Sequence, residues 1–290
     1  MFANRASVIA TLLLGLCIIP FPGVAASSYD SCTGFIDSLP AVITRQGEWC
    51  LRKDLNTAIT SGNAITISAN NVTVDCNNFK VGGLAGGDNS TALGILATDR
   101  QNAIVRRCNV RGFSFGIAIR GGAGHLVEDN RLDNNLFMGI EVSGDNGLIR
   151  NNRVFDTGGE RQIAYGIVSG GADVIDNIVS GVLTASTPSN TNYPHGIIAG
   201  VNGVVVQGNT IRGLVGAAGS PSAPVGIAFR TKGVIVDRNR ITAEAPLGSG
   251  IDKYTLATPD ADATCSNNIV RGFSSNYVGC VVNVGNIDLP

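Results

Sequence analysis

Four side chains in the second half of the sequence could together move a proton beside a carboxylate: His195, Tyr165, Arg230 and Lys232. Histidine and tyrosine can take a proton from carbon as general bases. Arginine binds a carboxylate through two parallel hydrogen bonds, and lysine adds a compact positive charge. This set predicts β-elimination or epimerisation of a sugar acid: His195 or Tyr165 moves the proton, while Arg230 and Lys232 neutralise the carboxylate.

A second group could hold neighbouring sugars, namely Arg120, Glu141, Asp252 and Tyr254. Two plainer interpretations stay open. Arg120 and Glu141 could form a solvated surface pair that contributes little. His195 could face the core, because the same place in other repeats holds apolar residues: Leu93, Phe115, Met138 and Val225.

An internal repeat must position these residues, and two columns define it. The first column is Gly followed by Ile, spaced 22 to 30 residues apart: Gly94-Ile95, Gly116-Ile117, Gly139-Ile140, Gly166-Ile167, Gly196-Ile197, Gly226-Ile227 and Gly250-Ile251. The second column is an Asn between apolar residues, with Cys108 in its place once: Asn77, Asn130, Asn152, Asn177, Asn209, Asn239 and Asn268. Repeats this short bury an apolar face only by stacking on one another.

The repeat predicts an all-β fold, a single right-handed parallel β-helix of about eight to nine coils, each adding about 4.8 Å. We expect an N-terminal cap and lead-in over residues 27–63 and the β-helix domain over 64–290. The Asn column should lie at a bend, since Asn tolerates the left-handed backbone region, and its side chains can bond from coil to coil.

Insertions mark one edge of this solenoid as the binding side. Most of the length variation falls just before the Gly-Ile strands, in residues 156–164, 182–194 and 215–224, with a further wall over 252–263. Insertions on one edge of a solenoid usually build its binding side. Strand alternation also points Val168 and Ile198 outward, which suits an apolar contact surface.

The first 26 residues predict a secretory signal, with Arg5 before an apolar run and a small-residue cleavage site near Ala26. No later stretch is apolar enough to cross a bilayer, so the mature chain should be secreted, extracellular or periplasmic, without a membrane span. A net charge of −1 argues against nucleic acid as partner.

Removal of Cys17 with the signal leaves six cysteines, an even number that suits an oxidising compartment. Of fifteen connectivities, we favour Cys32–Cys50, Cys76–Cys108 and Cys265–Cys280. Cys76 and Cys108 could alternatively be buried free thiols. No residue set has the spacing of a metal site.

The coils from about Ala64 to Asn283 resemble the pectin-lyase-like superfamily, in particular its exported bacterial β-helix repeat proteins. The resemblance implies the fold but no single chemistry, because the superfamily includes lyases, hydrolases, epimerases, tailspikes and non-catalytic proteins. His195-Gly196 and Arg230-Thr231-Lys232 echo elements of polygalacturonases, but the acidic motifs of those hydrolases are missing. Hydrolysis through paired carboxylates is therefore disfavoured.

Two hypotheses follow. The first is a secreted lyase or epimerase on a uronate-containing polysaccharide, and the second is a non-catalytic β-helix that binds glycan or belongs to a surface or envelope assembly. The predicted partner is a polysaccharide, and the first hypothesis requires an acidic one. No cofactor is predicted, a role for calcium stays open, and the sequence does not determine the oligomeric state.

Overall fold

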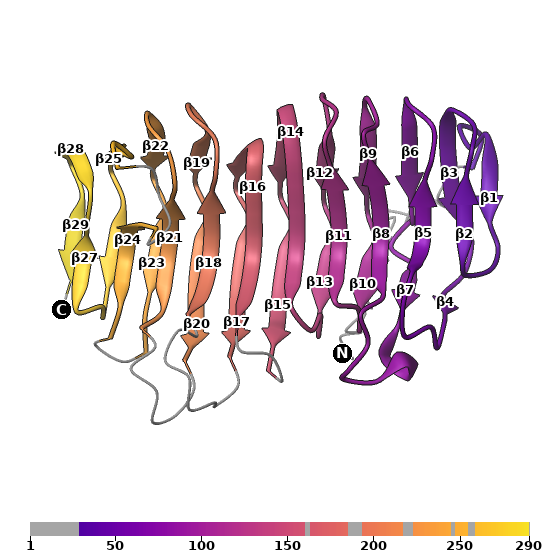
Figure 1. Cartoon of the computed structure of the whole chain (residues 1–290), viewed down its shortest axis with the longest axis horizontal. Helices are drawn as coiled ribbons and strands as arrows, with labels where there is room; N and C mark the ends of the chain where they lie inside the picture. Colours follow the sequence, from indigo (N-terminus) through magenta and orange to yellow (C-terminus); the bar gives the residue numbers. More distant parts are fainter. Residues whose placement is uncertain are drawn as a thin grey trace, which may run out of the picture. The chain divides into compact units, whose positions relative to one another are not determined.

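The computed structural model describes residues 29–159, 163–184, 193–216, 223–244, 247–254 and 259–289. Ser31–Pro290 forms one compact unit, and its described part consists of parallel strands plus one short 3-10 helix, η1 (Leu84–Gly86). The strands stack coil upon coil into a right-handed β-helix (Figure 1). The predicted all-β solenoid is therefore confirmed.

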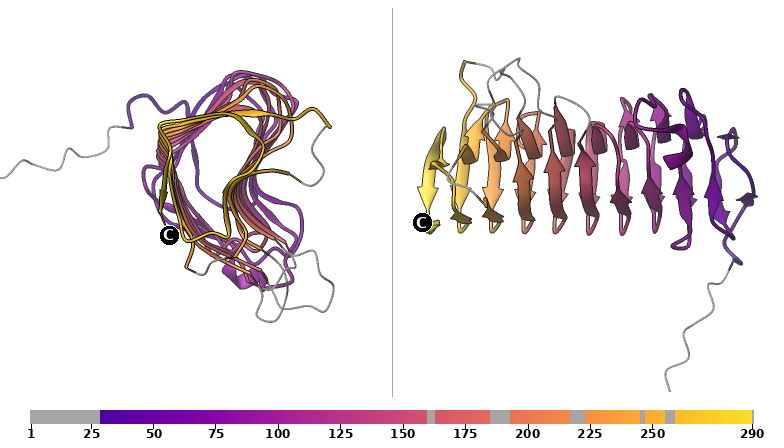
Figure 2. Two further views of the ribbon diagram at one scale, coloured as in Figure 1. Left: turned by 90° about the vertical axis from the view of Figure 1, so that its left-hand side faces the viewer. Right: turned by 90° about the horizontal axis from the view of Figure 1, so that it is seen from below.

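Each coil runs across three faces around an apolar interior (Figure 2). Face 1 carries the Gly-Ile column: β2 (Ala41–Ile43), β5 (Asn63–Ile67), β8 (Leu93–Thr98), β11 (Phe115–Arg120), the first parts of β14 (Met138–Arg150) and β16 (Ala164–Ile175), β18 (Pro194–Ala199), β21 (Val225–Phe229), β24 (Ser249–Lys253) and β27 (Ser275–Tyr277). Face 2 follows: β1 (Gly34–Ile36), β3 (Gly47–Leu51), β6 (Val72–Asp75), β9 (Ala103–Arg106), β12 (Leu126–Glu128), the last parts of β14 and β16, β19 (Val205–Gln207), β22 (Val234–Asp237), β25 (Ala263–Ser266) and β28 (Cys280–Val284). Faces 1 and 2 form one 19-stranded sheet.

Face 3 is a separate 10-stranded parallel sheet. Its members are β4 (Leu55–Asn56), β7 (Lys80–Gly82), β10 (Asn109–Arg111), β13 (Arg131–Asp133), β15 (Arg153–Gly158), β17 (Ile178–Leu183), β20 (Thr210–Val215), β23 (Arg240–Thr242), β26 (Ile269–Arg271) and β29 (Ile287–Leu289). Ten strands within the described residues mean about ten coils, more than the eight to nine predicted.

The ladder also begins before residue 64, the predicted start of the β-helix. Strand β1 pairs in parallel with β3, and β2 pairs with β5, so residues 34–56 already belong to the coils. They lack the Gly-Ile and Asn columns, but Ile36, Ile43 and Leu51 are buried and continue the core. The predicted signal over residues 1–26 lies outside the described residues, as do parts of the four insertions.

Stacked isoleucines form the inner layer of face 1. Ile167, Ile197 and Ile227 lie in register on neighbouring strands and are fully buried. The Gly before each Ile also faces inward: a Cβ on Gly196 would come 2.6 Å from Cγ2 of Ile211 on face 3. A side chain at this place would overlap the core, so Gly is required, and the residue before it turns outward.

The Asn column forms the predicted ladder at the bend between faces 2 and 3. The backbone N–H and Nδ2 of Asn152 donate to Oδ1 of Asn177 at 2.9 and 3.0 Å, and those of Asn177 donate likewise to Asn209. The amides are buried, so these bonds satisfy groups that would otherwise be costly. Asn77 has the expected left-handed φ angle (47°), but in the later coils this angle belongs to the residue before the ladder Asn, such as Asp176 (55°), which corrects the expectation for them.

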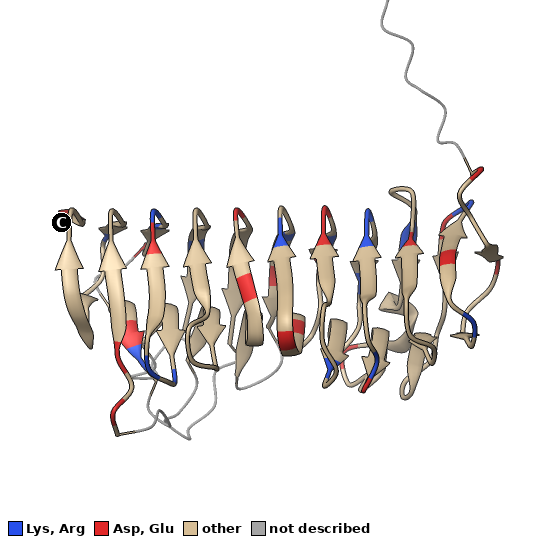
Figure 3. Ribbon diagram, turned by 90° about the horizontal axis from the view of Figure 1, so that it is seen from above, with Lys and Arg blue, Asp and Glu red and all other residues tan. Residues whose placement is uncertain are grey.

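Charged residues alternate in sign along a row of strand ends on face 2 (Figure 3). Asp75, Arg106, Glu128 and Arg150 stand in register on successive coils. Arg106 contacts Asp75 at 2.7 Å and Arg150 contacts Glu128 at 2.7 Å. Opposite charges on neighbouring strands attract, so this row neutralises itself.

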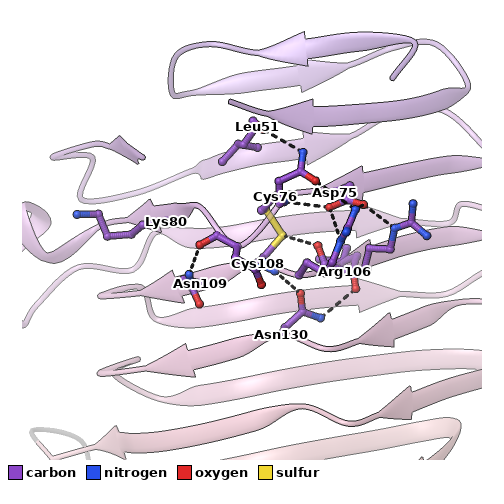
Figure 4. Close-up of a disulfide and its surroundings, with 12 residues drawn as sticks. Leu51, Asp75, Cys76, Lys80, Arg106, Cys108, Asn109 and Asn130 are labelled. Carbon is purple, nitrogen blue, oxygen red and sulfur yellow. Dashed lines mark hydrogen bonds and ion pairs between the residues drawn. A yellow bond between two sulfur atoms is a disulfide. The ribbon is translucent and has the colours of Figure 1, made fainter. Parts of the chain in front are cut away.

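Three disulfides link neighbouring parts of the ladder, as predicted: Cys32–Cys50, Cys76–Cys108 and Cys265–Cys280. Cys76–Cys108 begins the Asn ladder, because the N–H of Cys108 donates to Oδ1 of Asn130 at 2.9 Å (Figure 4). Three disulfides are typical of proteins from oxidising compartments. Nowhere in the described part of the chain is there a helix with the length and apolar character to span a membrane.

Candidate functional site

The candidate site lies on the outer surface of face 1, where strands β16, β18, β21 and β24 run side by side. Tyr165 and His195 occupy the same register position on β16 and β18. Ile198, Ala228 and Asp252 share a second outward position on β18, β21 and β24. Alternation from the buried Ile of each strand turns Ile198, Ala228 and Asp252 outward. His195 and Tyr165 lie on the same surface because the Gly after each of them also faces inward, which interrupts the alternation.

His195 is held as a neutral imidazole with one defined tautomer. Its side chain is 5% exposed, and Nδ1 lies 2.9 Å from the carbonyl oxygen of Tyr193. A carbonyl only accepts, so Nδ1 carries the proton and Nε2 carries the lone pair. Burial, with a smaller effect from the Arg230 charge, lowers the pKa of His195 to about 4. The imidazole is therefore neutral at ordinary pH and has the lone pair that a general base needs.

A row of aromatic rings crosses the coils at this surface. Phe137, Tyr165, His195 and Tyr254 follow one another at centroid distances of 5.5, 5.4 and 5.3 Å. Burial and a hydrogen bond with Tyr254 raise the pKa of Tyr165. The phenol of Tyr165 thus keeps its proton, which suits a proton donor better than a base.

Arg230 brings a positive charge to the same place. Its guanidinium carbon lies 4.2 Å from the centroid of the Tyr254 ring. Stacking on an aromatic face fixes the orientation of an arginine, and the guanidinium is a group that pairs with planar anions such as a carboxylate. The positive charge of Arg230 acts to lower the pKa values of both Tyr165 and His195. Burial has the larger effect on each group: it raises the pKa of Tyr165 and lowers that of His195.

A cavity of about 200 Å³ opens between these groups. Its walls come from β18, β21, β24 and the segment before β18: Tyr193, His195, Ala223, Val225, Ala228, Ser249, Asp252, Lys253 and Tyr254. Burial raises the pKa of Asp252, although hydrogen bonds from Ser249 and the backbone of Lys253 oppose the shift. The cavity thus combines a neutral imidazole, two phenols, a carboxyl group and the Lys253 cation around a space large enough for part of a sugar.

Not all predicted site residues meet there. His195, Asp252 and Tyr254 line the cavity. Tyr165 and Arg230 lie beside it, Tyr165 against the ring of His195 and Arg230 over the ring of Tyr254. Lys232 is placed in the turn after face 1, where its Nζ forms an ion pair with Asp260. It does not line the cavity.

Arg120 and Glu141 lie further along face 1. They form an ion pair of 2.7 Å with each other. This pairing agrees with the plainer interpretation of the two residues, a surface ion pair. Glu141 is four strands from Asp252 in register, which is about 19 Å at about 4.8 Å per strand.

The outward apolar residues do not form the exposed contact surface that the sequence suggested. Ile198 is fully buried, and Val168 is half-buried. Both belong to an apolar cluster outside the β-helix that includes Met138, Tyr165 and Ala228. Ile198 therefore packs beneath the site instead of presenting a surface to a partner.

Three polar residues of the cavity were not predicted as site residues: Tyr193, Ser249 and Lys253. Ser249 occupies the same column as His195, directly before the Gly, and that column was the available signal. Tyr193 lies within the 182–194 insertion, and its role depends on the path of the backbone. Nζ of Lys253 donates to the carbonyl of Pro259 at 2.7 Å.

Potential metal ligands gather at one place in the described ranges, at Cys32, Glu48 and Cys50. Cys32 and Cys50 are joined in a disulfide, so their sulfur atoms are not thiolate ligands.

Comparisons with known proteins agree with this architecture. A family model described as "Right handed beta helix region" matches residues 53–182. The enzymatically active domain of tailspike protein 2 from bacteriophage CBA120 is 13% identical, with a TM-score of 0.50, over 81% of this chain and 38% of its own. An alginate lyase from Paenibacillus sp. str. FPU-7 is 12% identical, with a TM-score of 0.42, over 88% of this chain and 98% of its own. No curated protein sequence matches the chain.

The chain is therefore a right-handed parallel β-helix with the pectin-lyase-like fold. It spans well under half of the tailspike chain. At such identities the likeness concerns the fold alone, and function must be argued from the site.

Proposed function

We propose that this protein binds an acidic polysaccharide across the outer surface of face 1 and removes the proton next to a uronate carboxylate in the His195 cavity. The observation that carries the proposal is the neutral imidazole of His195, fixed by Tyr193, at a cavity whose wall residue Tyr254 stacks with Arg230. A base and a carboxylate-binding cation are the two groups that this reaction requires first.

The reaction can be written with this chain's own residues. Arg230 pairs with the uronate carboxylate and stabilises the negative charge that develops when Nε2 of His195 takes the proton from C5. In elimination, the C4–O4 bond then breaks as a double bond forms between C4 and C5, and a phenol such as Tyr165 or Tyr254 gives its proton to the departing oxygen. In epimerisation, a proton instead returns to C5 from the opposite side.

Other residues of the surface suit substrate binding. Tyr193 and Tyr254 offer aromatic faces for sugar rings, while Ser249 and Asp252 offer polar groups for hydroxyls. The Arg120–Glu141 pair lies along the same face, where it would contact sugars several units from the reacting one.

The first test follows the ultraviolet absorbance of the unsaturated uronate that elimination produces, on polygalacturonate, alginate and hyaluronan, with and without calcium. We expect His195→Gln and Arg230→Gln each to lower the rate by about a hundredfold or more. Arg238→Gln is the matched control, since it removes one exposed cation on the following face. Equal rates in the wild type and His195→Gln would rule out His195 as the base.

A specific observation also supports a second function, glycan binding without turnover. His195 and Tyr165 are 5% and 9% exposed, so a sugar carbon would have little access to them without movement of the surrounding groups. On this alternative, calorimetry would detect glycan binding that Arg230→Gln weakens, while no glycan is altered.

A further inference from the structure

Charge is segregated between the two sheets of this nearly neutral chain. The 19-stranded sheet carries four cations and eight acids: Arg106, Arg120, Arg150 and Lys253 against Glu48, Asp75, Glu128, Glu141, Asp145, Asp173, Asp237 and Asp252. The 10-stranded sheet of face 3 reverses this balance, with seven cations against three acids: Lys80, Arg111, Arg131, Arg153, Arg212, Arg240 and Arg271 against Asp133, Asp156 and Asp288. Face 3 is therefore basic although the chain carries a net charge of −1.

The cations of the two sheets also differ in their partners. On the larger sheet, Arg106, Arg120 and Arg150 form close ion pairs with acids of neighbouring coils. On face 3, Arg153, Arg212 and Arg240 are exposed and form no ion pair within the described ranges. Three of the seven cations of face 3 are thus available to a ligand.

Two arginines of face 3 stand directly across from each other, Arg131 on β13 and Arg153 on β15. Like charges at such opposed positions destabilise a sheet. Asp133 approaches Arg131 at 4.0 Å, and the Phe155 ring lies 4.9 Å from its guanidinium carbon. Arg153 gains no such compensation from the described acids, and local conflicts of this kind often mark binding sites.

Hollows on face 3 bring these cations together in pairs. One of about 280 Å³ is lined by Lys80 and Arg111, with Asn56 and Thr57 beside them. A second of about 410 Å³ is lined by Arg131 and Arg153, with Asp129 and Asp176 on its wall. The third, of about 500 Å³, is lined by Arg212 and Arg240, with Glu244 beside them. The face therefore offers a succession of hollows along the stacking direction of the coils, each with a pair of cations, and the first and third have more cations than acids.

We propose that face 3 is a second binding surface, which holds a linear glycan bearing carboxylate or sulfate groups. Arginine pairs with either group in a bidentate manner. The cations recur at multiples of the coil spacing of about 4.8 Å, so a chain with a charge on successive sugars meets successive hollows. Charge complementarity would steer such a polymer to this face and away from the acidic sheet.

The lining of the hollows favours a glycan over other polyanions. Asn78, Asn109, Asn151, Thr210 and Thr242 lie beside the arginines, and their amides and hydroxyls both donate and accept, as sugar hydroxyls require. Separate hollows also suit a chain of rings better than a flat lipid surface. This inference does not rest on the His195 reaction, because face 3 and the face 1 cavity share no residue.

The test compares two triple variants that change net charge equally. Arg153→Gln, Arg212→Gln and Arg240→Gln together remove the unpaired cations of face 3. The control combines Arg45→Gln, Lys53→Gln and Arg238→Gln, which remove exposed cations elsewhere. Binding to polygalacturonate, heparin, neutral dextran and double-stranded DNA is measured by calorimetry at low and high salt. His195→Gln is included so that the two surfaces are tested separately.

We expect the face 3 variant to bind polygalacturonate or heparin about tenfold to a hundredfold more weakly at low salt, with a smaller salt dependence. The control should bind like the wild type at low salt, dextran should not bind, and the face 3 changes should weaken binding by the same factor with and without His195→Gln. Preference between the carboxylated and the sulfated polymer identifies the anionic group. Equal losses in both triple variants, DNA binding as tight as glycan binding, or no binding of either acidic glycan would each overturn the proposal.

Discussion

The burial of His195 predicts a specific dependence of stability on pH. Its pKa falls from 6.5 to about 4 on folding, and each pKa unit corresponds to about 1.4 kcal/mol. The folded protein therefore prefers the neutral ring by about 3 kcal/mol. This contribution is fully present above the unfolded pKa of 6.5 and is lost as pH falls through the folded pKa of about 4.

The perturbation is His195→Gln, which keeps a polar side chain of similar reach but cannot take up a proton. Denaturant unfolding of both proteins is followed at a series of pH values. The free energy of unfolding of the wild type should fall relative to that of the variant by about 3 kcal/mol between neutral pH and pH about 4. Nuclear magnetic resonance titration of the ring should give a pKa near the lower limit of that range.

Parallel stability curves for the two proteins, with the ring of His195 titrating near 6.5, would refute the reasoning. That result would mean that solvent reaches the imidazole. Burial would then no longer explain why His195 is a neutral base at ordinary pH.

Three further predictions concern the ladder, the disulfides and the cavity. Asn177→Ala removes a buried acceptor from the N–H of Asn152 and a donor to Oδ1 of Asn209. It should lower the free energy of unfolding by about 3 kcal/mol. As a control, substitution of the exposed Asn89 by Ala should change the free energy of unfolding by less than about 0.5 kcal/mol. Replacing both Cys76 and Cys108 by Ala opens a loop of sequence separation 32 and should cost about 2–4 kcal/mol in denaturant unfolding; an unchanged midpoint would contradict this. Burial raises the pKa of Asp252, so the folded state disfavours its charged form. Asp252→Asn should therefore raise the melting temperature at neutral pH while weakening glycan binding. A lower melting temperature would count against a burial cost at Asp252.

The repeat made the fold predictable because two columns recur wherever the backbone geometry demands them. Gly before Ile is required where a Cβ would overlap the core, as at Gly196. The ladder Asn is required where buried amides bond from coil to coil. The first coils were missed because residues 34–56 achieve the same pairing with apolar residues alone.

The sequence predicts the site only as far as the alternation of inward and outward residues along each strand allows. A period of two places Arg230 and Asp252 outward, but it places His195 inward and cannot show which outward residues become covered. His195 reaches the outer surface because Gly196 as well as Ile197 faces the core. Ile198 is buried by residues from neighbouring coils. Lys232 forms an ion pair with Asp260, a residue of the segment between β24 and β25. The basic character of face 3 depends on adding the charges of strands far apart in the sequence, which requires the register of the coils.

The measurement that tests the central claim most directly is the incorporation of deuterium at C5 of a uronate glycan incubated with the protein in heavy water. Both elimination and epimerisation begin by removing this proton, so the measurement does not depend on the later step. The account predicts changes at C5, seen as deuterium incorporation or as loss of the C5 proton, that His195→Gln abolishes and Arg238→Gln leaves intact. An intact C5 proton on every acidic glycan that binds face 1 would contradict it and leave glycan binding as the function of the cavity.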